Sequence, residues 1–295
     1  MKMGFFELLL LGYKNYLKGV KFLIQHQLYW YVVFPVILFL GIYWLGSYFK
    51  VIETNIAGEL LQNGSSITTL NGLTWYTAKM VFFFSLNVVF TKFALYIVVV
   101  ILSPVLSILS EKIEEIITGN KYPFNLPQLW HDVRRGAKIA LRNIIWEYFF
   151  IVLVLGIASF FNDSIKSILI FSIPMIFGFY FYGFSFIDYI NERRRLNIQQ
   201  SIYFVSKHRG LAFAIGSIYS IFFLSFHIVY RQFDTLSTDT PTQLFWGTIL
   251  VLTFILAAVA PIIAITSATL SMHDIVNLKK NKHADKPIVE SKKEE

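Results

Sequence analysis

A single lysine lies where a charged side chain is costly. Lys92, in the stretch NVVFTKFALYI, carries the one formal charge near the middle of a long apolar segment. An ammonium group in hydrocarbon costs a few kcal/mol or more unless it is paired or hydrated, so such a residue is a candidate functional site. Alternatively, its long stem reaches toward the headgroups, or the nearby Asn87 and Thr91 line a hydrated face with it.

Three adjacent guanidinium groups, Arg193 to Arg195, follow a run of Phe, Tyr and Ile. They could bind an anion, hold the chain against a lipid surface, or mark the side of the membrane that the segment faces. Their position at the end of an apolar segment favours the last two roles, and we expect them at the cytosolic headgroup level. Asp188 is expected to pair with one of them, and Asn197 and Gln200 to cap the helix that follows.

A second basic cluster lies in QLWHDVRRGAKIALRNIIW, residues 128 to 146. Arg134, Lys138 and Arg142 share one helical face and apolar residues share another, which is typical of a helix on an anionic leaflet. Each cation near such a surface contributes about 1 kcal/mol. Membrane-surface binding is therefore favoured over a specific anion site. A third alternative is pairing with carboxylates earlier in the chain: Glu111, Glu114 and Glu115.

Residue patterns for catalysis are absent from the sequence. It contains no Gly-rich phosphate loop, no HExxH or GxSxG motif and no pair of acids at a catalytic spacing. It has no cysteine, and none of its six histidines lies four residues from another. We therefore expect no enzyme activity, no metal site and no cofactor. The net charge of +8 follows basic loops between apolar segments, so nucleic acid is not an expected partner.

Membrane helices must position these side chains. Hydrophobic residues make up 56% of the chain and charged residues 15%, against about 25% charged residues in soluble domains. The sequence therefore predicts an all-α integral membrane protein. Two long transmembrane helices are expected at 28–49 and 80–109, with kinks at Pro35 and Pro104 and a C-terminal cap at Gly119. Two further helical hairpins, full or partly penetrating, are expected at 146–161 with 165–187 and at 211–230 with 243–270.

The two ends of the chain differ from these spans. Lys14, Lys18 and Lys21 share one face of an N-terminal amphipathic helix that we expect in the membrane interface, and cytoplasmic amphipathic helices are expected at the basic clusters. The last segment is polar, mixed in charge and aperiodic. This composition predicts a disordered cytosolic tail over 276–295, after a single membrane domain over 1–275.

Basic residues gather on one side of the predicted spans. The loops of that side carry most of the lysines and arginines, whereas the opposite loops hold only Lys50, Lys79, Lys166 and Arg231. Cytoplasmic loops of membrane proteins carry the excess of Lys and Arg. We therefore expect an integral protein of the cell (inner) membrane with both termini cytoplasmic.

Three stretches resemble parts of the CysZ-type sulfate permeases and the related etoposide-induced membrane proteins. SPVLSILSEKIEEIITGN is similar to the end of one helix in these proteins, which carries a Leu-x-Glu element and ends at a Thr-Gly pair. FIDYINERRRLNIQQSIYFVSKHRGLAFAIGS resembles a second hallmark, an Asp-Tyr leading to a basic turn, an amphipathic helix, a basic pair and a membrane segment with glycine. YLKGVKFL, followed by a proline, is similar to the amino-terminal helix and first span. The matching residues are Lys18, Gly19, Pro35, Ser103, Pro104, Leu109, Glu111, Thr118, Gly119, Asp188, Tyr189, Arg195, Arg209 and Gly216.

The resemblance, over roughly residues 10 to 275, implies two long transmembrane helices with hairpins that penetrate partway, an oligomer, and passive sulfate uptake feeding cysteine synthesis. Family permeases carry a Gly-Leu-Arg or Gly-Ile-Arg-Arg element before the first span, which looks like an oxyanion site. Here Gln27, Tyr29 and Trp30 stand in that place. Tyr and Trp donate single hydrogen bonds but supply no charge and no bidentate fork.

The sequence therefore predicts a membrane permease or channel for a small inorganic anion, sulfate by resemblance. The alternative is a non-transporting membrane scaffold or partner-binding membrane protein. The expected partners are the lipid bilayer, sulfate or another small anion, and further copies of the chain in a homo-oligomer. The candidate substrate path comprises Lys18, Lys92, Asn87, Tyr29 and Trp30. The candidate cytoplasmic basic mouth or interface comprises Arg134, Lys138, Arg142, Asp188, Arg193, Arg194, Arg195 and Arg209.

Overall fold

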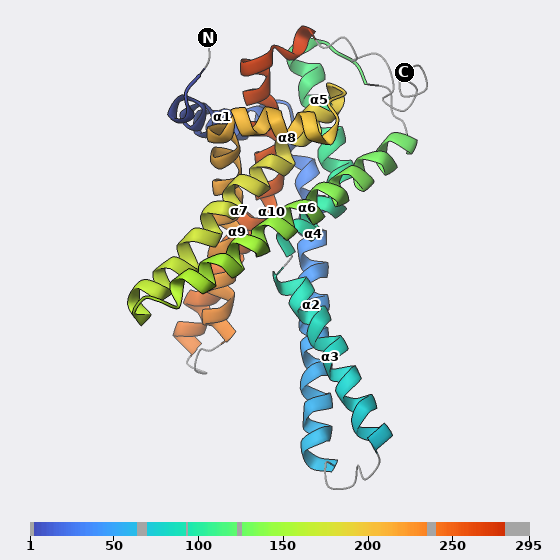
Figure 1. The fold of residues 1–295 in the computed structure, drawn as a ribbon. Coiled ribbons are helices and arrows are strands. Elements are labelled where there is room, and N and C mark those ends of the chain that lie inside the picture. The colour runs from blue at the N-terminus through green and yellow to red at the C-terminus, as the bar shows by residue number, and fades with distance from the viewer. Residues whose placement is uncertain (1–2, 64–69, 93, 123–125, 235–239, 281–295) are drawn as a thin grey trace. The chain divides into compact units, whose positions relative to one another are not determined.

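The chain is almost entirely helical in the computed structural model (Figure 1). The structure describes residues 3–63, 70–92, 94–122, 126–234 and 240–280, and these ranges contain no strand. The predicted all-α class is therefore confirmed.

The helices form two compact units. One comprises Met1–Phe34 with Val99–Glu295, and the other comprises Pro35–Val98. The predicted single membrane domain over 1–275 stays a prediction. In the second unit lie most of α2 (Val33–Asn63), α3 (Leu70–Lys92) and most of α4 (Ala94–Ile101). The first unit holds α1 (Phe5–Gln25), η1 (Leu28–Val32), α5 (Ser103–Thr118), α6 (Leu126–Ala158), α7 (Asp163–Arg193), α8 (Ile198–Lys207), α9 (Arg209–Asp234), α10 (Thr240–Val276) and η2 (Leu278–Lys280).

Several helices are long and apolar enough to cross a membrane. Among the described residues there are five, and a sixth if one bent pair of helices counts as a single span. Only 22% to 56% of the apolar stretch of each of the five is buried inside the protein. Since most of this apolar surface faces outward, lipid is its natural neighbour, and the chain is an integral membrane protein. The five are Leu28–Ile56, Leu126–Ala158, Asp163–Arg193, Arg209–Phe233 and Pro241–Val276.

The second predicted span breaks next to Pro104. The helical axes of Leu95–Ile101 and Ser103–Thr118 differ by 64°, so the predicted kink is confirmed. Pro104 lies in the first turn of α5, where its missing N–H removes no intrahelical hydrogen bond. α5 ends at Gly119, whose φ of 80° lies in the left-handed region, and its N–H donates to the carbonyl of Glu115 at 2.8 Å. The predicted C-terminal cap is therefore also confirmed.

α6 unites two elements that the sequence analysis separates. The expected surface helix at 128–146 and the expected membrane segment at 146–161 belong to one helix of 33 residues, about 50 Å long. No glycine or proline stands between them to end the helix, and the change from an amphipathic to an apolar pattern does not interrupt it. The segment from 146 is therefore the second half of a long helix rather than a short one.

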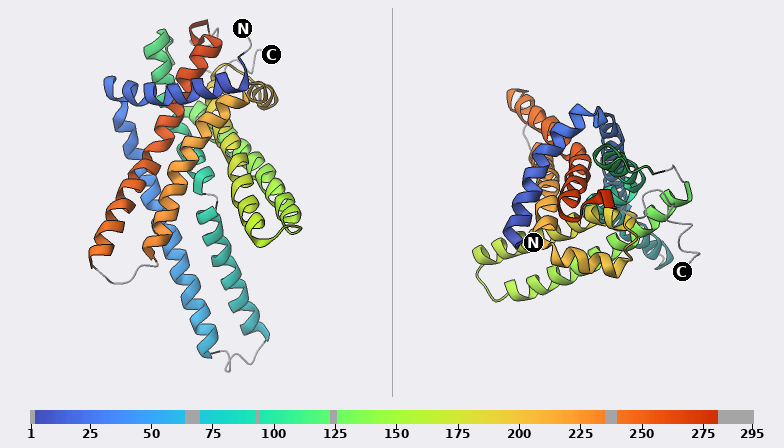
Figure 2. Two further views of the ribbon diagram at one scale, coloured as in Figure 1. Left: turned by 90° about the vertical axis from the view of Figure 1, so that its left-hand side faces the viewer. Right: turned by 90° about the horizontal axis from the view of Figure 1, so that it is seen from above.

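α1 crosses one end of α9 and α10 (Figure 2). Its buried face includes Asn15, whose amide donates to the hydroxyl of Ser271 and to the carboxylate of Asp274, both at 3.0 Å. Tyr16 donates its hydroxyl to the carbonyl of Ile215. Burial raises the pKa of Tyr16 well above its ordinary value, so the phenol keeps the proton that this bond needs. The predicted lysine face, Lys14, Lys18 and Lys21, is exposed.

α7 and α9 approach so closely that their backbones touch. A Cβ atom at Gly183 of α7 would collide with the carbonyl oxygen of Ala212 on α9, and one at Gly216 of α9 would collide with that of Phe179. Small residues allow this approach in membrane bundles, where packing and hydrogen bonds rather than hydrophobic burial join the helices. α7 is therefore fixed against α9 along this stretch.

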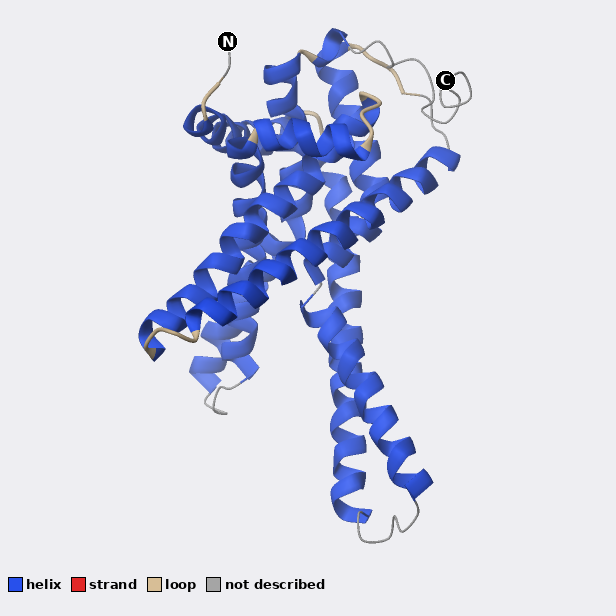
Figure 3. Cartoon of the chain, in the orientation of Figure 1, coloured by secondary structure: helices blue, strands red, loops and turns tan. Residues whose placement is uncertain are grey.

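A short connection joins α6 and α7 into a helical hairpin (Figure 3). Ser159–Asn162 links α6 to α7, and the side chain of Asn162 caps α7 by accepting from the N–H of Ile165 at 3.0 Å.

η2 lies in the segment expected to be a disordered tail. Its Leu278 is buried, and its carbonyl accepts from the amide of Asn120 at 3.0 Å. Residues 281–295 of that tail lie outside the described residues.

Candidate functional site

A buried ion pair joins α5 to the end of α7. Arg193 is 2% exposed, and its Nε lies 3.2 Å from Oε2 of Glu114, which is fully buried. The Nη2 of Arg193 donates to the hydroxyl of Ser110 at 2.7 Å, and Tyr122 donates to Oε1 of Glu114 at 2.5 Å. Hydrogen bonds to both charged groups offset part of the desolvation that burying them costs.

A second buried pair joins α6 to α7. Arg135 donates through Nε and Nη2 to the two oxygens of Asp188, each at 2.8 Å. Its Nη1 donates to the carbonyl of Leu196 at 2.7 Å, beyond the end of α7. The hydroxyl of Ser201 on α8 donates to Asp188 at 2.5 Å, so α8 contributes to the same network. This fork-to-fork geometry fixes the relative position of the two helices as well as their charges.

The register of α6 against α7 explains how these charges meet. His131 and Arg135 are four residues apart on α6, and Asp188 and Glu192 are four apart on α7, so each pair shares a helical face. The helices are antiparallel neighbours in a hairpin, which sets Arg135 opposite Asp188 and His131 opposite Glu192. Nδ1 of His131 lies 2.7 Å from Oε1 of Glu192, and Nε of Arg135 lies 3.7 Å from Oε2 of the same residue.

The same end of α7 supports the break before α5. The carbonyl groups at the end of a helix have no intrahelical donor. Tyr189 donates its hydroxyl to the carbonyl of Val99 at 3.0 Å, in the last turn of α4. Gly136 of α6 faces Ser103 at the start of α5, leaving room for this close arrangement. We call Glu114, Arg193, Arg135, Asp188, Tyr189, His131, Asp132 and Glu192 the polar core.

The three adjacent arginines lie in different surroundings, and one of them corrects the expectation. Arg193 is not a surface residue, because it is enclosed by the protein. Arg194 lies over the ring of Phe204 at 5.0 Å and donates to Asn191 at 3.0 Å. Arg195 has a φ of 57°, and its buried Nε and Nη2 make no hydrogen bond to a described residue.

Asp188 belongs to the site but does not pair as expected. Its partner is Arg135 of α6, not a member of the arginine run that follows it. The expected cap of the next helix is confirmed. The side chain of Asn197 accepts from the N–H of Gln200 at 2.8 Å, and the side chain of Gln200 accepts from the N–H of Asn197 at 2.9 Å.

The remaining basic candidates lie at or near the surface. Arg134 and Lys138 are exposed, and Arg134 lies over the ring of Trp130 at 5.2 Å. Arg142 is partly buried against Phe184 and donates to Asn143 at 3.1 Å. Arg209 is exposed and donates to the carbonyl of Ser206 at 2.9 Å. Their interaction with an anionic leaflet stays a prediction.

The candidate substrate path is only partly visible. Lys18, Tyr29 and Trp30 are exposed on α1 and η1, away from the polar core's interior. The side chains of Lys92 and Asn87 lie outside the described residues. The path along these five residues therefore stays a prediction.

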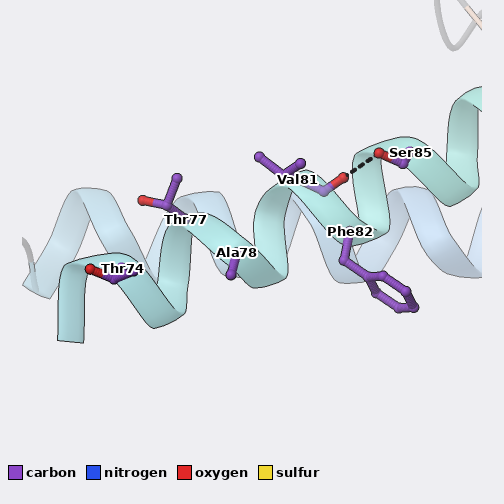
Figure 4. Close-up of a pocket in the computed structure, with 6 residues that line it drawn as sticks. All are labelled: Thr74, Thr77, Ala78, Val81, Phe82 and Ser85. Carbon is purple, nitrogen blue, oxygen red and sulfur yellow. Dashed lines mark hydrogen bonds between the residues drawn. The ribbon is translucent and has the colours of Figure 1, made fainter. Parts of the chain in front are cut away.

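A hollow on α3 offers little to a charged ligand (Figure 4). Its lining comes from successive turns of the one helix, and the hydroxyl of Ser85 is already used as a donor to the carbonyl of Val81 at 2.7 Å. Since no lining side chain is charged, we do not regard it as an anion site. The lining residues are Thr74, Thr77, Ala78, Val81, Phe82 and Ser85.

Part of the polar core was not predicted from the sequence. Arg135, His131, Asp132 and Glu192 were not singled out, although the spacing His-x3-Arg on one helix and Asp-x3-Glu on the next was a usable signal. Among the described residues, His131, Asp132 and Glu192 also form a group with metal-ligand atoms within 4.8 Å of one another. Two of these ligands are adjacent and the third lies on another helix, so a search for spacing within one helix could not find them.

Comparison with known families identifies the chain. The model of the family described as "Sulfate transporter CysZ/Etoposide-induced protein 2.4" matches residues 15–226, more than half of the sequence. The chain belongs to this family. No curated protein matches it significantly. Within the CysZ/etoposide-induced protein family match lie most of α1, the broken helix α4–α5 and all of α6 to α8, so every member of the polar core falls inside it.

Proposed function

We propose that the protein is a permease or channel that passes a small inorganic anion, sulfate in the first instance, across the membrane. The observation that carries this proposal is the match to the CysZ/etoposide-induced protein family over residues 15–226. The set of membrane-spanning helices found along the same residues is consistent with it.

Among the four arginines near the end of α7, Arg195 is best suited to bind the anion. Arg135 and Arg193 are held by carboxylates, and Arg194 by an amide and an aromatic ring. Two buried nitrogens of Arg195 make no hydrogen bond to a described residue, so they are available to donate to an oxyanion. A guanidinium group matches the oxygens of sulfate, and a single such contact binds weakly enough to permit release.

The membrane orientation follows from the distribution of charge. Basic residues concentrate at the ends of α6, α7 and α8 and in the segment from Lys279. Under the positive-inside rule, this side and both termini would be cytoplasmic, and Arg195 would lie at the cytoplasmic mouth of the path. Assembly of several copies into a homo-oligomer is part of the same proposal.

Uptake of labelled sulfate into proteoliposomes tests the proposal. Protein-containing vesicles should take up sulfate faster than empty ones, and both Arg195→Ala and Lys92→Ala should slow the uptake. Arg231→Ala is the matched control, since this exposed arginine in the last turn of α9 belongs to neither the proposed path nor its mouth. Uptake equal to that of empty vesicles would refute transport of sulfate, and unchanged uptake by both variants would refute these residues as its path.

The paired arginines of the polar core favour one alternative, a membrane scaffold that transports nothing. In a scaffold, the buried arginines would serve only to hold helices together, as Arg193 holds α7 to α5. This alternative predicts an intact, folded protein with no flux of sulfate, phosphate or chloride. Flux of any of these anions above that of empty vesicles would exclude it.

A further inference from the structure

One buried carboxylate of the polar core has no donor of its own. Asp132 on α6 is 1% exposed, and neither of its oxygens accepts a hydrogen bond of standard geometry from a described residue, although the hydroxyl of Ser107 lies close. A buried polar atom without a partner costs about 1–3 kcal/mol, and more if it is charged. Native structures therefore seldom keep such a group unless something absent from the polypeptide satisfies it.

The neighbouring charges do not balance Asp132. Arg135 is held in a bidentate pair by Asp188, and Arg193 is held by Glu114. The remaining basic group near Asp132 and Glu192 is then His131. Arg135 makes only a longer contact to Glu192, at 3.7 Å.

Even with its imidazole protonated, His131 supplies one positive charge for two carboxylates. Glu111 on α5 adds a further negative charge near Asp132. Buried carboxylates stay ionised only when they are paired or coordinate a metal. The local excess of negative charge therefore indicates a missing cation.

We propose that His131, Asp132 and Glu192 bind a divalent transition-metal ion, with zinc the best fit. Imidazole nitrogen and carboxylate oxygen are both ligand types that zinc accepts, and a site with three protein ligands leaves a fourth position for water. The nitrogen ligand disfavours magnesium and calcium, which take oxygen ligands. With the imidazole neutral and bound to the metal, two positive charges balance Asp132 and Glu192.

The geometry is close to that of a bound site. Zinc bonds to nitrogen and oxygen are about 2.0–2.2 Å long, so a tetrahedral site sets its ligand atoms roughly 3.4 Å apart. The candidate ligand atoms lie within 4.8 Å of one another, and the nearest two, on His131 and Glu192, are 2.7 Å apart. These separations bracket the ideal value, so side-chain adjustments suffice.

The ion has a route into the site and a structural role there. The side chain of His131 is 31% exposed, whereas that of Glu192 is 4% exposed, so the ion enters past the imidazole. Once bound, it joins the first turns of α6 to the last turn of α7, next to the Tyr189 cap of the helix break. This inference does not rest on transport, because the site lies among residues that hold the fold.

Metal binding to the detergent-solubilised full-length protein tests the site. The protein is stripped with a chelator, zinc chloride is added, and binding is followed by calorimetry, by metal analysis after dialysis and by thermal unfolding. We expect one zinc ion per chain and a rise in the unfolding temperature. Asp132→Asn and His131→Gln should each weaken zinc binding roughly 10–100-fold or more, at least as much as the loss of an outer-shell partner does.

Matched controls separate this site from general metal binding. Glu115→Gln removes a partly exposed carboxylate of α5, and His26→Gln removes an exposed histidine directly after α1; both variants should bind zinc as the unaltered protein does. Equal binding by Asp132→Asn and the unaltered protein would overturn the proposal. So would the absence of any stoichiometric zinc in the unaltered protein.

The metal-free proteins give a second readout that also reports folding. Without zinc, Asp132→Asn should unfold at the same temperature as the unaltered protein or higher, since it removes an unbalanced negative charge. If this variant does not fold, His131→Gln, whose side chain is partly exposed, decides the zinc affinity alone. A stabilised Asp132→Asn together with no zinc binding in the unaltered protein would instead assign the missing cation to a proton.

Discussion

α7 contacts α6 and α9, two of its neighbours, by opposite means. Toward α6 it presents Asp188 and Glu192, which meet Arg135 and His131. Toward α9 it presents Gly183, where no side chain at all is tolerated. The contact with α6 requires that each buried charge keeps its partner. The contact with α9 requires that the residue at the contact has no side chain.

The comparison teaches which kind of change each contact can survive. A polar contact can lose both partners together and remain stable, because no charge is then left unpaired. A backbone contact has no such compensation, since any added Cβ meets a carbonyl oxygen that cannot move without its helix. The predictions below test this difference.

Gly216→Val should give the largest effect. Its Cβ would collide with the carbonyl of Phe179 and force α9 away from α7. We expect a loss of more than about 4 kcal/mol, beyond the usual range for a single substitution. Size-exclusion chromatography and thermal unfolding in detergent measure the outcome. Gly156→Val on α6 is the control, since a Cβ there meets nothing within 4 Å; equal behaviour of the two variants would refute the backbone contact.

Glu114→Gln should be the next most damaging. It leaves Arg193 buried without a counter-charge, which typically costs about 3–5 kcal/mol. Adding Arg193→Met to the same chain should restore most of the unfolding temperature. The control is Glu115→Gln, whose partly exposed pair with Lys112 contributes about 0–1 kcal/mol. A double variant no more stable than Glu114→Gln alone would show that the pair acts through something other than its charge.

Asp188→Asn should have an intermediate effect. It weakens the fork with Arg135, but Arg135 keeps its bond to the carbonyl of Leu196 and lies 3.7 Å from Glu192. Hydrogen bonds to charged groups contribute about 1.5–3 kcal/mol, which sets the expected loss of stability. Chemical denaturation would measure it. A loss as large as that of Glu114→Gln would mean that Glu192 offers Arg135 no second partner.

Asn197→Ala should have the smallest effect of the four. It removes the capping box at the start of α8, for an expected loss of about 1 kcal/mol. The unfolding temperature should fall slightly, while Gln199→Ala, at an exposed position two residues later, should leave it unchanged. A larger loss for Asn197→Ala would indicate that the position of α8, and with it the bond from Ser201 to Asp188, depends on this cap.

Local features of the fold were predictable because each depends on residues close in sequence. The cap at Gly119, the bend at Pro104 and the capping box at Asn197 are set within one helical turn. The continuity of α6 was not predicted, because its pattern changes from amphipathic to apolar and such a change often marks the end of a helix. No residue at that point breaks the helix.

The polar core was less predictable because its partners are far apart in sequence. α7 ends at Arg193 and Arg195 has a φ of 57°, so the three arginines do not continue one helix: Arg193 is buried, whereas Arg194 and Arg195 are only partly buried. Glu114, the partner of Arg193, lies 79 residues earlier, and no local pattern connects the two. By contrast, the matched four-residue spacings on α6 and α7 were visible in the sequence and indicated a paired hairpin.

The position of α1 has a consequence for biosynthesis. The amide of Asn15 bonds to Asp274, 259 residues later, so its partner leaves the ribosome long after α1 does. Until α9 and α10 have both been made, the polar face of α1 is not fully covered, while its leucines and lysines suit the surface of the bilayer. α1 therefore completes its docking long after its own synthesis, once these two later helices are present.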